Sequence, residues 1–141
     1  MSLVVDAGPL VSLAMADDPA ARAVEQTLAK ELGEIVVTAQ ITAEVDYLLR
    51  ERVGVQARRA FLADLAAGRF RVQCLDLTDY ALIRAYNIQY ADLDVGLSDL
   101  TIVATAHRLQ TKRILTFDQR HFRALRPLDG GSFILLPADE P

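Results

Sequence analysis

The sequence predicts an α/β fold, a three-layer α/β/α domain built on a mainly parallel five-stranded sheet. Short runs of β-branched and apolar residues alternate along the chain with longer segments of helical periodicity. This alternation is typical of crossover connections between parallel strands. The 141 residues can bury a real core, and a hydrophobic content of 52% excludes a disordered chain. We therefore expect a single domain over residues 1–141.

Five short segments have the composition of buried strands. They are Leu3–Asp6, Glu34–Thr38, Arg71–Leu75, Arg113–Phe117 and Ser132–Leu136. The Gly8-Pro9 pair predicts a break after the first of them. Cys74 lies in the third segment, so we expect a buried structural thiol, and a single cysteine fits a reducing cytoplasm.

Five longer segments are predicted helices because apolar residues recur in them every three or four positions. They cover about residues 19–32, 40–52, 56–67, 78–90 and 97–109. Asp18 is the expected N-cap of the first, with Pro19 at its first position, and Thr78 is the expected N-cap of the fourth. Gly54 and Gly68 follow the second and third helices.

The charge pattern is uneven. The formal net charge is −4, which alone argues against a nucleic-acid binder. Residues 107–126, however, carry a single acid, Asp118, among six basic side chains: Arg108, Lys112, Arg113, Arg120, Arg123 and Arg126. A protein with a negative net charge can therefore still carry a ring of basic side chains around one acidic residue. A solvated surface of mixed charge explains the same pattern equally well.

Nothing in the sequence predicts a membrane protein or a secreted one. No apolar run approaches the roughly 20 residues needed to span a bilayer. The first ten residues have no basic region, and Asp6 interrupts their apolar run, so they do not resemble a signal peptide. We expect a cytoplasmic protein.

Two aspartates follow predicted strands, Asp6 after the first and Asp118 after the fourth. The carboxyl ends of parallel strands lie at one edge of a sheet, where ligands bind in open α/β folds. Each aspartate taken alone could equally be a turn residue or the N-cap of the next helix.

Two further acids lie on or beside the apolar stripes of helices, near the helix starts. Glu44 follows Ile41 by three positions, and Asp99 lies one turn before Ile102. An unpaired buried carboxylate costs several kcal/mol, so each needs a partner. For Glu44 the simple alternative is an ion pair with an arginine or a position at the border of the core, and for Asp99 it is helix capping together with Ser98.

The four acids together predict a divalent metal site. Carboxylates that converge on one edge repel one another unless a cation holds them, and Mg²⁺ or Mn²⁺ prefers such oxygen ligands. No histidine or cysteine stands at the spacing of a zinc site, and we expect His107 and His121 to be surface or phosphate-contacting groups. Such a pocket suits phosphodiester hydrolysis with one or two metal ions. Phosphate contacts are expected from Arg108, Lys112, Arg113, Arg120 and Arg123.

Four stretches of the chain together resemble the PIN-domain nucleases, and among them the VapC-type toxins of bacterial toxin–antitoxin modules. They are VVDAGPL near the start, VVTAQITAEVDYLL, YADLDVGLSDLTIVATAHRLQ, and ILTFDQRHFRAL near the end. They cover nearly the whole chain in order, although each stretch alone is only moderately specific. The fold implied is a PIN-like α/β/α domain.

The resemblance assigns a role to each acid. Asp6, Glu44 and Asp99 match the three metal-binding acids of the family, and Asp118 matches the more variable fourth. Asp92 or Asp94 matches an extra acid that often precedes the third. The activity implied is a Mg²⁺-dependent endoribonuclease, with Mn²⁺ as a substitute, that cleaves tRNA, rRNA or mRNA and so inhibits translation and growth. The partners implied are a second copy of the chain and a small cognate antitoxin.

One position departs from the family pattern. Many relatives carry Ser or Thr two residues after the first aspartate, and this chain has Gly8 there. Thr116 and Ser98 are the candidates for supplying the missing hydroxyl. The alternative function is a non-catalytic PIN-like module that binds RNA or protein, which would have no need of four crowded acids. A phosphoacceptor receiver domain is disfavoured because the expected acidic pair and lysine are absent.

Overall fold

A computed structural model describes the whole chain, Met1–Pro141. Its five strands form one sheet, and the order across the sheet is β3-β2-β1-β4-β5. Every neighbouring pair is parallel, so the predicted five-stranded sheet is confirmed and is parallel throughout. The strands are β1 (Leu3–Val5), β2 (Ile35–Thr38), β3 (Arg71–Gln73), β4 (Arg113–Leu115) and β5 (Ile134–Leu136).

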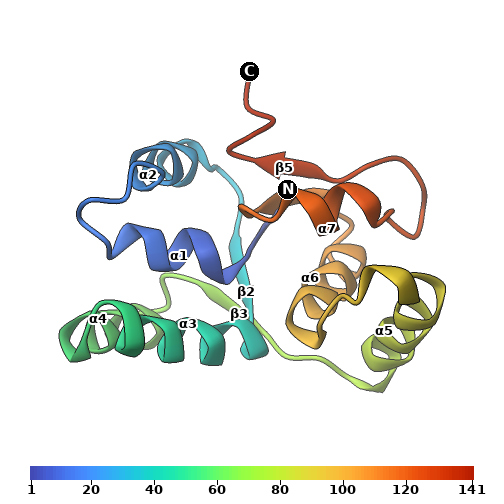
Figure 1. Cartoon of the computed structure of the whole chain (residues 1–141), viewed down its shortest axis with the longest axis horizontal. Helices are drawn as coiled ribbons and strands as arrows, with labels where there is room; N and C mark the ends of the chain where they lie inside the picture. Colours follow the sequence, from blue (N-terminus) through green and yellow to red (C-terminus); the bar gives the residue numbers. More distant parts are fainter.

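Helices cover both faces of this sheet. In Figure 1, α1 to α4 lie on one side of the strands and α5 and α6 lie on the other, which makes the sheet the middle of three layers. None of the helices is long and apolar enough to cross a membrane. The helices are α1 (Ala7–Leu13), α2 (Ala21–Lys30), α3 (Ala39–Arg52), α4 (Val55–Ala66), α5 (Leu77–Gln89), α6 (Leu97–Arg108) and α7 (Gln119–Ala124), with a 3₁₀ turn, η1, at Ala91–Leu93.

The centre of the core is β1, whose three residues are fully buried. It pairs with β2 on one side and β4 on the other. The chain adds β2 and β3 on the first side and then crosses back to add β4 and β5 on the second. The carboxyl end of β1 is therefore the point where the strand order reverses, which is where open α/β sheets bind ligands.

Two helices were not predicted, and both begin at an aspartate that follows a strand. Asp6 caps α1 by accepting a hydrogen bond from the Ala7 amide at 2.8 Å. The predicted end of the first strand before Gly8-Pro9 is confirmed, since β1 ends at Val5, but the chain then continues as a helix: Pro9 lies in the first turn of α1, where a missing amide hydrogen has no consequence. Asp118 caps α7, a helix of only six residues, which is too short to show a periodic pattern.

Both predicted N-caps are displaced. Asp18 lies in the turn before α2, where its carboxylate accepts from the Ala20 amide at 2.9 Å, and Ala20 is the N-cap. Asp76, not Thr78, caps α5, and it forms a reciprocal capping box with Asp79. In this box the Asp76 carboxylate accepts from the Asp79 amide and the Asp79 carboxylate accepts from the Asp76 amide, so two amides without a helical partner are satisfied.

Cys74 is exposed, and its predicted burial is wrong. The strand β3 ends at Gln73 and lies at the outer edge of the sheet, with Arg71 and Val72 exposed. Cys74 therefore belongs to the connection that leaves the sheet towards α5.

Candidate metal centre

Asp6 and Asp118 lie at adjacent strand ends, joined through Thr116. The Thr116 hydroxyl donates to Asp6 Oδ2 at 2.7 Å and accepts from the Asp118 amide at 3.0 Å. Thr116 is itself buried. The Thr116 hydroxyl therefore makes the hydrogen bond to Asp6 that a Ser or Thr at position 8 would otherwise supply. This bond fixes the orientation of the Asp6 carboxylate.

Asp99 projects from the first turn of α6 towards this edge. The N-cap of α6 is Gly96, and no side chain makes a capping hydrogen bond. The capping interpretation of Ser98 and Asp99 is therefore wrong, and the Asp99 carboxylate is free for another purpose. Seven consecutive residues of α6, Leu100 to Ala106, are buried, so the helix holds Asp99 rigidly.

Glu44 completes the group from α3. It forms no ion pair with any lysine or arginine, so the salt-bridge interpretation is also wrong. Burial raises the pKa of Glu44 and the Asp6 charge raises it further, while a hydrogen bond with Ser98 lowers it in part. The structure thus places Ser98 beside Glu44 and Thr116 beside Asp6. We refer to Asp6, Glu44, Asp99 and Asp118 as the acidic site.

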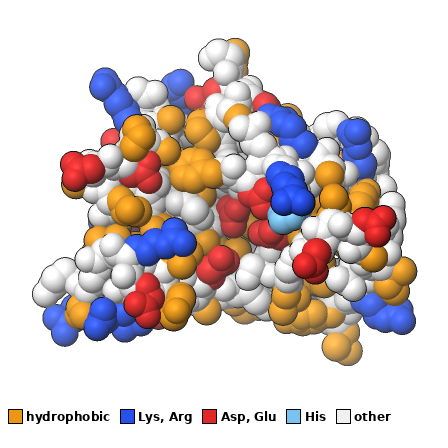
Figure 2. All heavy atoms as spheres, in the orientation of Figure 1, with side chains coloured by type: hydrophobic (Ala, Val, Ile, Leu, Met, Phe, Trp, Pro, Cys, Tyr) orange, Lys and Arg blue, Asp and Glu red, His pale blue; other side chains and the backbone are white.

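The electrostatics of the acidic site favour an added cation. Burial raises the pKa of Asp99 to about 6, with further increases from the charges of Asp6, Asp118 and Glu44. Burial likewise raises the pKa of Asp6, against the hydrogen bonds from Thr116 and Ala7. Figure 2 shows acidic side chains gathered in the middle of one face, between the α1–α3 side and the α6–α7 side of Figure 1, with a histidine next to them.

His121, expected from the sequence to be a surface or phosphate-contacting group, lies beside these acids. His121 Nδ1 lies 2.8 Å from Asp118 Oδ2 and 3.7 Å from Asp99 Oδ2. Candidate ligand atoms of Asp99, Asp118 and His121 all lie within 4.8 Å of one another. The signal in the sequence is the Asp118–His121 spacing of three, which places both side chains on one side of the first turn of α7.

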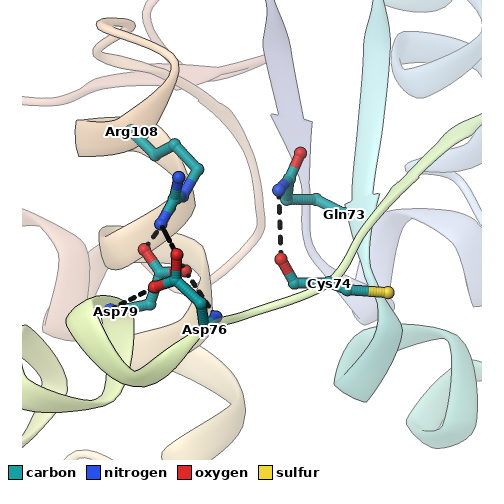
Figure 3. A network of polar contacts seen from close by, with 5 residues as sticks. All are labelled: Gln73, Cys74, Asp76, Asp79 and Arg108. Atoms are coloured by element: carbon teal, nitrogen blue, oxygen red, sulfur yellow. Dashed lines mark hydrogen bonds and ion pairs between the residues drawn. The ribbon is translucent and has the colours of Figure 1, made fainter.

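Three of the five basic residues expected to contact phosphate lie elsewhere. Arg108 ends α6, nine residues or about 13 Å beyond Asp99, and it forms ion pairs with Asp76 and Asp79 at 2.8 and 2.9 Å (Figure 3). Lys112 and Arg113 lie at the amino end of β4, opposite to the acidic site. Lys112 donates to the Gly130 carbonyl, and Arg113 pairs with Glu31 at 2.7 Å.

The other two basic residues lie on α7, beside the acidic site. Arg123 is held by Asp139 at 2.7 Å and by the Gln119 side chain. Arg120 is exposed and forms no ion pair, so its guanidinium is free. Asp92 and Asp94 are exposed in and just after η1, and neither is among the charges that raise the pKa of Asp99.

The residues of the acidic site fit a hard divalent ion. All four acids offer carboxylate oxygens, and no lysine or arginine is ion-paired with any of them. Oxygen-rich sets of this kind suit Mg²⁺ and Mn²⁺, and an imidazole nitrogen such as that of His121 is better tolerated by Mn²⁺.

Comparisons with known proteins identify the family of the chain. The PIN domain family model matches residues 3–126. The chain is 34% identical over 135 residues to Ribonuclease VapC26 of Mycobacterium tuberculosis, a match that covers 96% of this chain and all of that protein.

Solved structures share the fold at lower identity. The crystal structure of Mycobacterium tuberculosis VapC20, described as a Sarcin-Ricin loop cleaving toxin, matches with a TM-score of 0.77 and 18% identity, over 84% of this chain and 91% of that one. A toxin–antitoxin complex from Klebsiella pneumoniae matches with a TM-score of 0.68 and 16% identity, over 87% of this chain and 92% of that one. The chain therefore belongs to the PIN-domain family and, within it, to the VapC group.

Proposed function

We propose that the chain is a Mg²⁺-dependent endoribonuclease and the toxin of a VapBC-type toxin–antitoxin module, with Mn²⁺ as a substitute ion. The observation that carries this proposal is the acidic site: four carboxylates converge at the ligand-binding edge of the sheet, and no lysine or arginine is ion-paired with any of them. The 34% identity to a protein named as a VapC ribonuclease supports the assignment.

Each residue of the site has a distinct proposed role. Asp6, Glu44, Asp99 and Asp118 would hold the ion, Thr116 orients Asp6, and Ser98 orients Glu44. His121 holds Asp118 by its hydrogen bond and is available as a nitrogen ligand. When bound, a divalent ion supplies an acidified water and neutralises charge on the phosphate.

The same proposal names the partners. RNA of the tRNA, rRNA or mRNA class is the substrate, and the free guanidinium of Arg120 is the phosphate contact nearest to the acidic site on α7. A small cognate antitoxin and a second copy of the chain complete the assembly implied by the VapC resemblance. The expected site of action is the cytoplasm, where its RNA substrates are.

The test is cleavage of purified RNA by purified protein, followed by mapping of the new 5′ ends. Wild type is expected to cut with Mg²⁺ or Mn²⁺ and to stop in EDTA. Asp99→Asn and Glu44→Gln are expected to lose at least about 100-fold of this activity. Asp46→Asn is the matched control because Asp46 lies on the same helix as Glu44 but is paired with Arg58 at 2.8 Å.

Two outcomes would contradict the proposal. Equal cleavage by Asp99→Asn would mean that a contaminating nuclease or a different site does the cutting. No cleavage of any RNA by wild type, with RNA still bound, would favour the non-catalytic binding module.

A further inference from the structure

Phe117 is an exposed aromatic residue that directly precedes Asp118 of the acidic site. Its neighbours Thr116 and Asp118 both belong to the site, and its side chain is 41% exposed while Thr116 is 1% exposed. The other four phenylalanines are buried or packed against the core. The Phe117 ring is therefore not part of the core packing, although it follows directly on a buried strand.

The Phe117 ring packs against Gly8. A Cβ atom added at Gly8 would lie 3.3 Å from Phe117 Cδ2, closer than side chains normally pack. Gly8 follows Asp6 by two residues in the first turn of α1. The absence of a side chain at position 8 thus allows the ring to lie against the first turn of α1, the helix that Asp6 caps. Figure 2 shows hydrophobic side chains adjoining the acidic ones in the middle of this face.

We propose that Phe117 is a stacking platform for a base of the RNA substrate next to the cleaved phosphate. This inference rests on the proposed ribonuclease function and extends it to the form of the substrate. A ring can stack only on a base whose face is free, so the platform selects RNA with an unpaired base at the cleavage site rather than a continuous duplex.

Charge makes an aromatic contact useful at this place. The carboxylates that bind an ion also repel the phosphates on either side of the cleaved one, and added arginines would compete with the ion for those carboxylates. Stacking attracts the substrate without any charge. Arg120, exposed and unpaired three residues along the chain, can hold a flanking phosphate while the base rests on Phe117.

Fluorescence can test the contact directly because the chain contains no tryptophan. Phe117→Trp in the uncleaving Asp99→Asn background creates a single reporter at the platform. A stem-loop RNA is expected to quench it saturably, and the fully paired duplex of the same sequence to quench it much less. The matched control is Leu32→Trp, because Leu32 is 100% exposed and lies before β2, at the opposite edge of the sheet.

Binding and cleavage measurements complete the test. In the same background, Phe117→Ala is expected to weaken stem-loop binding by about 5- to 100-fold, the loss of one base–aromatic stack, while Phe117→Tyr retains it. Gly8→Ala, which displaces the ring, is expected to give an intermediate loss. Circular dichroism and thermal unfolding of each variant separate a lost contact from a lost fold.

The possible failures are distinguishable. The stacking proposal is overturned if the Asp99→Asn parent binds RNA and Phe117→Ala binds it equally well. It is also overturned if the reporter of the Phe117→Trp variant is quenched no more than that of the Leu32→Trp control, and the ring then only covers Gly8. If wild type cleaves no RNA and the parent binds none, the ribonuclease function itself fails, and the stacking proposal fails with it.

Discussion

Two groups of acids in this molecule are built in opposite ways. In the Arg108 clamp, formed by Asp76, Asp79 and Arg108, one guanidinium bonds both carboxylates at 2.8 to 3.1 Å (Figure 3). Backbone amides at the start of α5 add further donors to both acids. In the acidic site, four carboxylates converge and none is ion-paired with a lysine or arginine; the Arg52 charge only lowers the pKa of Glu44 in part.

The pKa values reflect this difference. Backbone and Arg108 hydrogen bonds hold the pKa of Asp76 below its ordinary value, whereas burial and three neighbouring acids raise that of Asp99 to about 6. The clamp joins the start of α5 to the end of α6, so its charges stabilise the fold. The charges of the acidic site oppose folding until a cation arrives, which is typical of a site shaped by its ligand.

The largest expected effect is the removal of one repelling charge. The folded pKa of Asp99, about 6, lies above its ordinary value of 3.8, so between these values the folded state binds more protons than the unfolded state and stability falls as the pH rises. Without divalent ions, Asp99→Asn should therefore stabilise the protein by at most about 3 kcal/mol at about pH 7.5. The gain should shrink progressively towards about pH 4, as urea unfolding of both proteins in EDTA would reveal. A gain that is independent of pH would contradict the raised pKa of Asp99, which burial causes first and the neighbouring acids second.

The clamp should respond in the opposite direction. Asp79 is buried and bonds Arg108 through both oxygens, so Asp79→Asn should destabilise the protein by about 2 kcal/mol. Asp76→Asn is the milder partner variant because its side chain is 58% exposed. Chemical denaturation measures both, and ribonuclease activity per folded molecule should stay unchanged. A selective loss of activity would place the clamp in the functional machinery.

A bound divalent cation should neutralise the acidic site, so that its charges no longer oppose folding while those of the Arg108 clamp support it. At a free Mg²⁺ or Mn²⁺ concentration about ten times its dissociation constant, wild type should gain about 1.4 kcal/mol, or about 3–5 °C in Tm. Asp99→Asn should gain much less, and Asp79→Asn should gain as much as wild type does. Thermal unfolding across a titration of each ion provides the measurement, and an equal shift in all three proteins would mean that the ion binds elsewhere.

The smallest expected effect concerns one hydroxyl. Thr116→Val removes the donor to Asp6 and should cost about 1 kcal/mol of stability and roughly ten-fold in cleavage rate. Thr105→Val is the control, since the Thr105 hydroxyl is also buried but has no hydrogen-bond partner. Loss of cleavage in both variants would point to packing rather than to the Asp6 contact.

Much of this arrangement could be predicted from residue patterns. Apolar periodicity located the long helices, β-branched runs located the strands, and the parallel topology implied that Asp6 and Asp118 share an edge. Thr116 was foreseen as a hydroxyl donor only because Gly8 lacks one. Asp6 and Asp118 were found because they follow strands, and Glu44 and Asp99 because they lie on apolar helix stripes, where an acid needs a partner.

The remainder depends on contacts that no local pattern encodes. The distance of Arg108, Lys112 and Arg113 from the acidic site could not be predicted because closeness in sequence to Asp118 says nothing about which end of a helix or strand they occupy. His121 was assigned to the surface or to phosphate contact because its approach to Asp99, 22 residues away, arises only through the packing of α6, although its spacing of three from Asp118 is visible in the sequence. The predicted burial of Cys74 is wrong because the sequence does not reveal which strand forms the edge of the sheet.

The strand order determines when the acidic site can assemble during synthesis of the chain. The Thr116–Asp6 hydrogen bond spans 110 residues, and the acids divide evenly: Asp6 and Glu44 precede the crossover from β3 to β4, while Asp99 and Asp118 follow or lie within it. A nascent or truncated chain that lacks its last third carries two acids and no assembled centre. The proposed ribonuclease would thus be inert while it is being made, and would become active only once β4 docks against β1.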